Sequence, residues 1–94
     1  MSVSARTGKP LAVATAVAVE GDVLHVSLSD GRELRLPIAE FDFLRDATPE
    51  QRAAGVVWEK GTALWWEDLL DGISVAGLID VGETELERFA GVWD

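Results

Sequence analysis

The feature that most constrains the fold is a series of short alternating apolar runs separated by turn residues. In residues 23–29, Leu and Val on one parity alternate with mostly polar residues on the other, and residues 34–36 repeat the pattern. Such alternation is typical of half-buried β-strands. Asp30-Gly31 between these runs is a strong hairpin signal. With an earlier run at residues 13–19, joined through the tight turn at residues 20–22, they predict a three-stranded antiparallel meander.

The earliest run has one face of small side chains. Its valines and Thr15 share one parity, whereas Ala14, Ala16 and Ala18 occupy the other. We expect this alanine face to lie beneath a second layer of structure. Pro37 should end the third strand, because proline cannot donate a hydrogen bond to the ladder.

The middle of the chain carries helix signals. Residues 40–45 predict a single helical turn. Thr48 is expected to cap a second short helix, with Pro49 at its first position and Gln51 three residues after the cap. Gly55 should close that helix, since glycine is favoured just past a helix end.

A second hairpin is predicted further along. Residues 56–59 and 63–66 have the composition of strands and flank Lys60-Gly61. Asp71-Gly72 is expected to break the chain again. Residues 74–79 then predict a short helix that begins at a serine cap.

The last segment, residues 83–93, predicts an amphipathic helix, because apolar residues recur at i, i+3 and i+7 from Leu86. Its acidic first turn suits the helix dipole. The expected fold class is therefore α+β: an antiparallel β-meander, a second hairpin, short helices and a C-terminal amphipathic helix. We expect one domain over residues 11–94, preceded by a flexible leader at residues 1–10.

Tryptophans gather around the second hairpin. Trp65 and Trp66 are adjacent in a strand, so they must point to opposite faces of the sheet. One of them, with Trp58 nearby, is expected to pack in the core. The other is either covered by the terminal helix, through Phe89 or Trp93, or exposed. We favour the covered arrangement; an exposed tryptophan beside the acidic residues that come after it would be an interface anchor.

The charge is strongly negative and uneven. The 94 residues include 17 acidic and 8 basic side chains, for a formal net charge of −9. Residues 59–94 hold nine acids and two bases, whereas residues 1–58 hold eight acids and six bases. Proteins that bind DNA neutralise its phosphates with Lys and Arg, so this balance argues against direct nucleic-acid binding. The acidic half is either a solubilising surface, or one shaped for a basic partner or imitating the charge of nucleic acid.

Little in the sequence points to catalysis. The chain has no cysteine and one histidine, His25, on a strand that offers neighbouring serines no oxyanion hole. Glu67, Asp68 and Asp71 are oxygen ligands without the surrounding pattern of a calcium loop. No glycine-rich phosphate-binding motif is present. We therefore expect no enzyme activity, no metal and no cofactor.

The longest apolar run, Leu11 to Val19, is nine residues long, whereas a spanning helix needs about 20. The run ends in Glu20-Gly21-Asp22 rather than in the small residues of a signal-peptide cleavage site. We expect a cytoplasmic protein that does not enter the membrane.

Several spaced motifs resemble one bacterial family. They are Ser29-Asp30-Gly31-Arg32, Pro37, Ala47-Thr48-Pro49-Glu50-Gln51-Arg52, Trp66, Ile73-Ser74-Val75 and Gly77-Leu78. In order and spacing the chain is similar to the family called domain of unknown function 2442 over residues of about 12–80. The resemblance implies a small α+β fold with a hairpin-rich sheet. Some members accompany small toxins or are fused to a helix-turn-helix segment, so it also implies an antitoxin-like or regulatory role.

Two departures from that family matter. The family usually has an acidic run between the tryptophan and the Ile-Ser-Val stretch, but here the chain reads Leu70-Asp71-Gly72, with acids displaced to Glu67 and Asp68. The C-terminal residues 83–94 lie outside the resemblance. Without a helix-turn-helix segment, direct operator binding is not implied.

The hypothesis favoured by the sequence is a non-enzymatic antagonist that blocks a basic or nucleic-acid-handling protein. Its partner would be a toxin, if the protein is an antitoxin, or a CRISPR effector subunit, if it is a phage-type anti-CRISPR inhibitor that mimics DNA. The alternatives are a homodimeric structural, assembly or regulatory module that pairs through a free strand edge, and, third, a small enzyme or metal protein. The candidate partner-binding residues are Glu59, Trp65, Glu67, Asp68, Asp71, Asp80, Glu83, Glu85 and Glu87.

Overall fold

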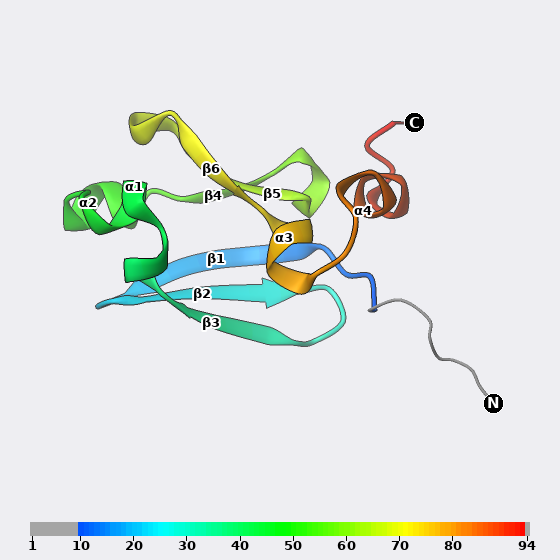
Figure 1. Ribbon diagram of the computed structural model, residues 1–94, viewed down its shortest axis with the longest axis horizontal. Coiled ribbons are helices and arrows are strands. Elements are labelled where there is room, and N and C mark those ends of the chain that lie inside the picture. Colours follow the sequence, from blue (N-terminus) through cyan, green and yellow to red (C-terminus); the bar gives the residue numbers. More distant parts are fainter. Residues whose placement is uncertain (1–9, 94) are drawn as a thin grey trace.

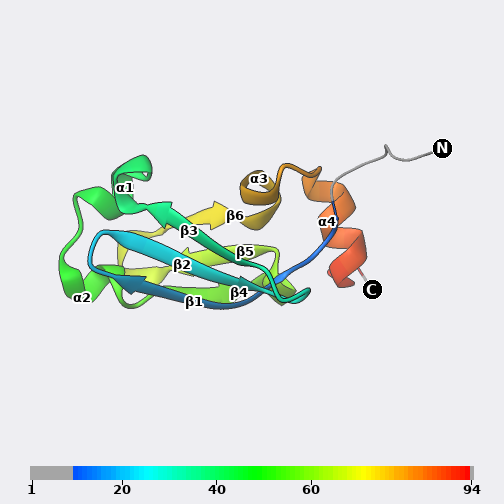
Figure 2. The same ribbon diagram turned by 90° about the horizontal axis from the view of Figure 1, so that it is seen from below.

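The structure, a computed structural model, describes residues 10–93 and consists of two stacked sheets flanked by short helices (Figures 1 and 2). Each sheet has three antiparallel strands, in the order β1-β2-β3 and β4-β5-β6. The predicted α+β class is confirmed. Apart from Pro10, the predicted flexible leader lies outside the described residues. None of the described helices is long and apolar enough to cross a membrane.

The first sheet is the predicted meander. Its strands are β1 (Ala14–Glu20), β2 (Val23–Leu28) and β3 (Glu33–Pro37). Gly21 and Gly31 take positive φ angles in the two connecting turns, which glycine adopts without a steric cost. Alternate residues of β2 face the second sheet and are buried, as the sequence pattern predicts.

The prediction that the alanine face of β1 lies under a second layer is wrong for most of the strand. Ala16 and Ala18 are exposed, while Val17 and Val19 pack partly against the core; only Ala14 is buried. The register shifts between Ala14 and Ala16, at a bulge. A bulge adds one residue to one strand and so reverses which face the later residues of that strand point to.

Three helical segments connect the sheets: η2 (Ile38–Glu40), α1 (Asp42–Arg45) and α2 (Pro49–Arg52). The two predicted helical turns are thus present. The predicted capping box is also present: the Thr48 hydroxyl accepts a hydrogen bond from the Gln51 backbone N–H at 3.1 Å, and the Gln51 side chain accepts one from the Thr48 N–H at 3.0 Å. These two bonds satisfy donors that a short helix cannot satisfy internally.

We expect Thr48→Ala to lower the free energy of unfolding by about 1 kcal/mol, because it removes the hydroxyl that caps α2. Urea denaturation followed by circular dichroism would measure the change. Thr48→Ser is the matched control, since it keeps the hydroxyl and should stay within a few tenths of a kcal/mol, on the order of experimental error. Equal losses in both variants would contradict the capping role.

The second sheet contains one strand more than predicted. Strands β4 (Val56–Trp58) and β5 (Ala63–Trp66) form the expected hairpin around η3 (Glu59–Gly61). The expected break at Asp71-Gly72 is wrong, because these residues begin β6 (Asp71–Ser74), which pairs with β5. The chain reverses through η4 (Glu67–Leu69) and a left-handed residue, Leu70. Leucine rarely adopts that conformation, so the sequence gives no turn signal there.

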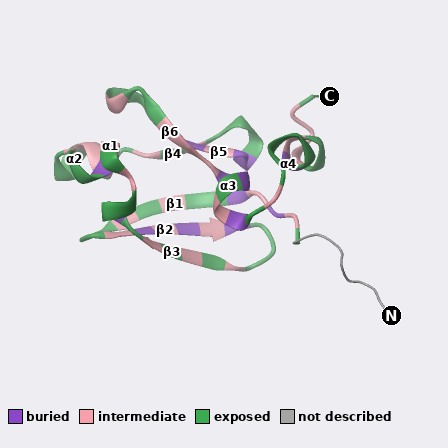
Figure 3. Ribbon diagram, viewed as in Figure 1, coloured by how far each residue is buried: buried purple, intermediate pink, exposed green. Residues whose placement is uncertain are grey.

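Two helices complete the chain: α3 (Val75–Ile79) and α4 (Glu83–Ala90). Ser74 occupies the predicted N-cap position of α3, but its side chain makes no capping hydrogen bond. The terminal helix ends earlier than predicted, because Gly91 takes a left-handed conformation and leaves Trp93 beyond it. Figure 3 shows buried residues on β2, β5 and α3. The outer side of α4 is exposed in the same view.

Trp66 is the largest side chain of the core and is 1% exposed. Its indole meets the Phe43 ring edge-on, with centroids 5.5 Å apart, and its N–H donates to the Arg52 carbonyl at 3.0 Å. Gly55 lies against the same indole, so that a Cβ there would come within 2.5 Å of it. The core between the two sheets therefore packs closely around this one tryptophan.

Candidate functional site: an acidic aromatic groove

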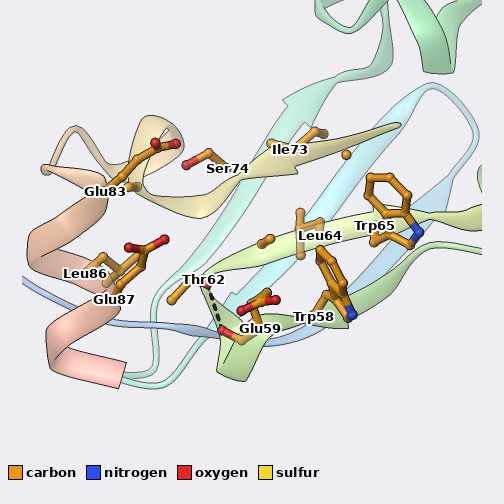
Figure 4. Close-up of a pocket in the computed structure, with 13 residues that line it drawn as sticks. Trp58, Glu59, Thr62, Leu64, Trp65, Ile73, Ser74, Glu83, Leu86 and Glu87 are labelled. Atoms are coloured by element: carbon orange, nitrogen blue, oxygen red, sulfur yellow. Dashed lines mark hydrogen bonds between the residues drawn. The ribbon is translucent and has the colours of Figure 1, made fainter. Parts of the chain in front are cut away.

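A groove of about 460 Å³ lies between α4 and the outward face of the second sheet (Figure 4). Its volume falls in the range of ligand pockets, roughly 300–1,000 Å³. One wall is made by β4, η3 and β5, and the other by α4. The side chains that give it its character are Trp58, Glu59, Trp65, Glu83, Leu86 and Glu87.

The sheet wall carries two indoles. The strand register pairs Trp58 with Ala63 and Val56 with Trp65, so the two tryptophans are diagonal neighbours on one face. Their ring centroids are 5.4 Å apart, with an interplanar angle of 30°. Trp58 remains 50% exposed, so the groove presents an accessible aromatic surface.

Two contacts hold Trp65 in place. Its indole N–H donates to the Glu67 carboxylate at 2.8 Å. Its ring lies over Gly72 of the neighbouring strand, where a Cβ would come within 2.9 Å of Cε3. Gly72 is therefore required for close approach of the ring, which explains why an apparent chain-breaking residue stands inside β6.

The helix wall carries two carboxylates. Glu83, Leu86 and Glu87 are spaced i, i+3 and i+4, so they share one face of α4. Leu86 is fully buried and anchors the helix, while Glu83 and Glu87 point toward the sheet in Figure 4. At the far end of the helix, the Lys60 ammonium donates to the Gly91 carbonyl at 2.8 Å and ties η3 to α4.

The negative charge of this groove is not neutralised. Glu59, Glu83 and Glu87 form no ion pair with any residue in the range 10–93. The two nearby cations are engaged elsewhere: Lys60 binds a carbonyl, and the Arg88 guanidinium lies over the Trp93 ring at 5.6 Å. One oxygen of Glu87 accepts the Trp93 indole N–H at 3.1 Å. The groove therefore combines uncompensated carboxylates with apolar rings.

The structure divides the candidate binding residues into groups. Glu59, Trp65, Glu83 and Glu87 line the groove. Glu67, Asp68 and Asp71 surround the η4 turn, at the end of the second sheet away from α4 (Figure 1). The remaining two are Asp80, which ends α3 in a left-handed conformation, and Glu85, which is exposed on α4 and does not line the groove.

The expected cover over the second tryptophan is absent from the described residues. Phe89 and Trp93 are both more than half exposed, and Trp93 packs on its own helix through Arg88 and Glu87. Trp65 is partly buried, and its ring lies beside that of Trp58, which is itself half exposed rather than packed in the core. The hairpin predicted around Lys60-Gly61 was the signal that could have placed Trp58 and Trp65 on one face, because its register makes them diagonal neighbours.

The residues considered for catalysis or metal binding lie apart from the groove lining. His25 lies on β2, outside the groove, with Nε2 3.4 Å from the Glu20 carboxylate. In residues 10–93 no group of three His, Asp or Glu side chains is arranged to hold a metal ion.

Two stacked sheets, short helices and an acidic groove define a small α+β domain. The chain belongs to the family described as protein of unknown function (DUF2442), which it matches over residues 14–83. Its fold is similar to that of a protein of unknown function from Rhodospirillum rubrum, with a TM-score of 0.70 and 23% sequence identity. The similarity covers 76% of this chain and 88% of that one. No curated protein matches the chain.

The motifs that carry the family resemblance have structural roles in this chain. The Asp30 carboxylate accepts hydrogen bonds from the Arg32 backbone N–H and guanidinium, which hold the pKa of that carboxyl below its ordinary value. The Arg52 guanidinium donates to the carbonyls of Leu44 and Arg45, both at 2.7 Å, and so closes the end of α1. The family signature thus specifies the scaffold. Most of α4, which supplies one wall of the groove, lies beyond the matched residues.

Proposed function

We propose that this protein is a non-enzymatic binding module that antagonises a basic, nucleic-acid-handling partner protein by occupying its cationic surface. The observation that carries the proposal is the groove, whose lining combines two adjacent indoles with three carboxylates that form no ion pair within residues 10–93. Exposed aromatic anchors flanked by charge are typical of protein interfaces, and complementary charge speeds association and excludes wrong partners. The net charge of −9 supports a basic partner. Such an encounter would take place in the cytoplasm.

Two forms of this antagonist share the same chemistry: an antitoxin directed at a small toxin, and an inhibitor of a CRISPR effector subunit. A DNA mimic needs carboxylates that succeed one another along a surface as phosphates do. Here the acids of the groove and those of the η4 turn are separated, and Asp80 and Glu85 lie in neither group. This arrangement favours capture of a basic segment in the groove over imitation of an extended duplex.

The proposal is tested by calorimetric titration of the full chain against the purified product of the neighbouring gene, which we expect to be a basic protein. We expect affinity to fall by at least about tenfold between ~50 mM and ~500 mM salt, because salt screens the attraction between exposed charges. Reversing the groove charges with E59K, E83K and E87K together should abolish binding. The matched control, E33K, E40K and E50K together, reverses three exposed charges outside the groove and should retain it.

Salt-insensitive binding, or equal loss in both triple variants, would overturn the proposal. A homodimer that buries the groove, detected by light scattering across concentrations, would overturn it in favour of an assembly module. Relief of toxin-induced growth arrest identifies the antitoxin form, and loss of DNA binding by a CRISPR effector identifies the other.

A further inference from the structure

We infer that the groove between α4 and the second sheet binds an arginine side chain of the basic partner; this inference rests on the function proposed above. It requires a place for the long apolar stem of arginine and a place for its planar guanidinium. The groove offers both at neighbouring positions, since Trp58 and Glu59 are consecutive residues at the end of β4.

The stem has a surface to pack on. Trp58, which is 50% exposed, lines the sheet wall of the groove next to the indole of Trp65. A cation over an indole face is attracted by the ring quadrupole, and arginine is found there more often than lysine. The methylene groups of the stem would at the same time cover apolar area that is now exposed.

The guanidinium has acceptors on both walls. Glu59 reaches the groove from η3, and Glu83 and Glu87 reach it from α4, as Figure 4 shows. Glu59 comes directly after Trp58 and has a φ of 52°, which turns the chain out of the strand at this point. The carboxylates of Glu59 and Glu83 accept no hydrogen bond and form no ion pair within the described part of the chain, and the hydrogen bond from the Thr62 hydroxyl goes to the Glu59 backbone carbonyl. Carboxylates with free oxygens therefore line both walls of the groove.

Arginine fits this combination better than lysine. Its planar guanidinium stacks on an aromatic ring and donates in a fork that matches carboxylates, and it is weakly hydrated. A lysine ammonium is a compact, strongly hydrated charge and gains less from the indole face. The nearest internal lysine, Lys60, is engaged with the Gly91 carbonyl rather than with these acids.

The experiment uses three synthetic peptides, acetylated and amidated, with two glycines on each side of a central arginine, lysine or citrulline. Each is titrated into the full chain by NMR, and the indole N–H signals of Trp58 and Trp65 are monitored. We expect the arginine peptide to shift both signals and to bind at least about threefold more tightly than the lysine peptide. The uncharged citrulline peptide should not bind measurably.

Two variants locate the site. E59Q, E83Q and E87Q together should weaken binding of the arginine peptide by at least about tenfold, whereas E33Q, E40Q and E50Q together should stay within about twofold. Trp58→Leu keeps an apolar side chain but removes the ring, so it should reduce the preference for arginine over lysine to about one. Thermal unfolding of each variant confirms that the fold is retained.

Equal binding of the arginine and lysine peptides would overturn the inference, as would equal weakening in the two charge variants. If the peptides leave both indoles unshifted while the partner protein still binds in a salt-dependent manner, the inference is wrong and the proposed function stands. If the arginine peptide binds as expected while the basic protein does not, the proposed function is wrong and the groove serves a different arginine ligand.

Discussion

Replacing Trp66 with alanine should lower the free energy of unfolding by about 3–5 kcal/mol, the largest effect we expect from one substitution in this protein. The indole is 1% exposed and fills the space between Phe43 and Gly55. Its removal leaves a cavity and also leaves the Arg52 carbonyl without its donor. Since small domains are stable by only about 5–15 kcal/mol, the variant should be close to unfolding.

Urea denaturation monitored by circular dichroism measures this loss. If Trp66→Ala does not fold, Trp66→Phe provides a second measurement, with an expected loss of about 1–3 kcal/mol from the smaller ring and the missing N–H. Trp93→Ala is the control, because that indole is 61% exposed and its loss should cost less than about 1 kcal/mol. A loss of similar size at both positions would contradict the central role of Trp66.

The second large effect is expected at Gly61, where alanine should cost about 2–5 kcal/mol in total from the two sources of strain at this position. Gly61 has a φ of 87°, so any side chain there is strained by about 1–2 kcal/mol. Its added Cβ would also lie 2.5 Å from the Ala14 carbonyl oxygen and 2.7 Å from the Val13 Cβ. Backbone atoms cannot rotate away, so η3 and the start of β1 must separate, at a further cost of about 1–3 kcal/mol.

Gly31 offers a matched control for the part of the cost that comes from the positive φ angle. It has a φ of 93°, yet a Cβ built on it meets nothing within 4 Å. Gly31→Ala should therefore show the conformational cost alone, and the difference between the two variants measures how closely the layers pack. If Gly61→Ala and Gly31→Ala lower the midpoint of urea denaturation equally, close contact between η3 and β1 does not contribute to stability.

The first sheet and the short helices could be predicted from sequence because their signals are local. Alternation in residues 23–36 and the Asp30-Gly31 turn fix the meander. Thr48 and Gln51 form the capping box three residues apart. The family resemblance, which the family match confirms, also rests on local motifs, namely turns, helix caps and one core tryptophan.

The features that the sequence could not predict depend on tertiary contacts. The bulge in β1 reverses which side chains face the core, but the alternation of residue types in the sequence gives no sign of it. The third strand of the second sheet was missed because Gly72, a strand breaker by local rules, is required by the ring of Trp65. The groove itself depends on how α4 returns to the sheet, and helix periodicity alone does not specify a docking partner.

The position of α4 has a consequence for how such domains diversify. One wall of the groove comes from the scaffold defined by the shared motifs, and the other from a terminal helix that is mostly outside them. Related chains could therefore exchange ligand preference by altering about two turns of helix, while the sheets, the caps and the central tryptophan stay unchanged. The residues that contact a ligand and the residues that stabilise the fold would then evolve under separate constraints, in a chain of fewer than a hundred residues.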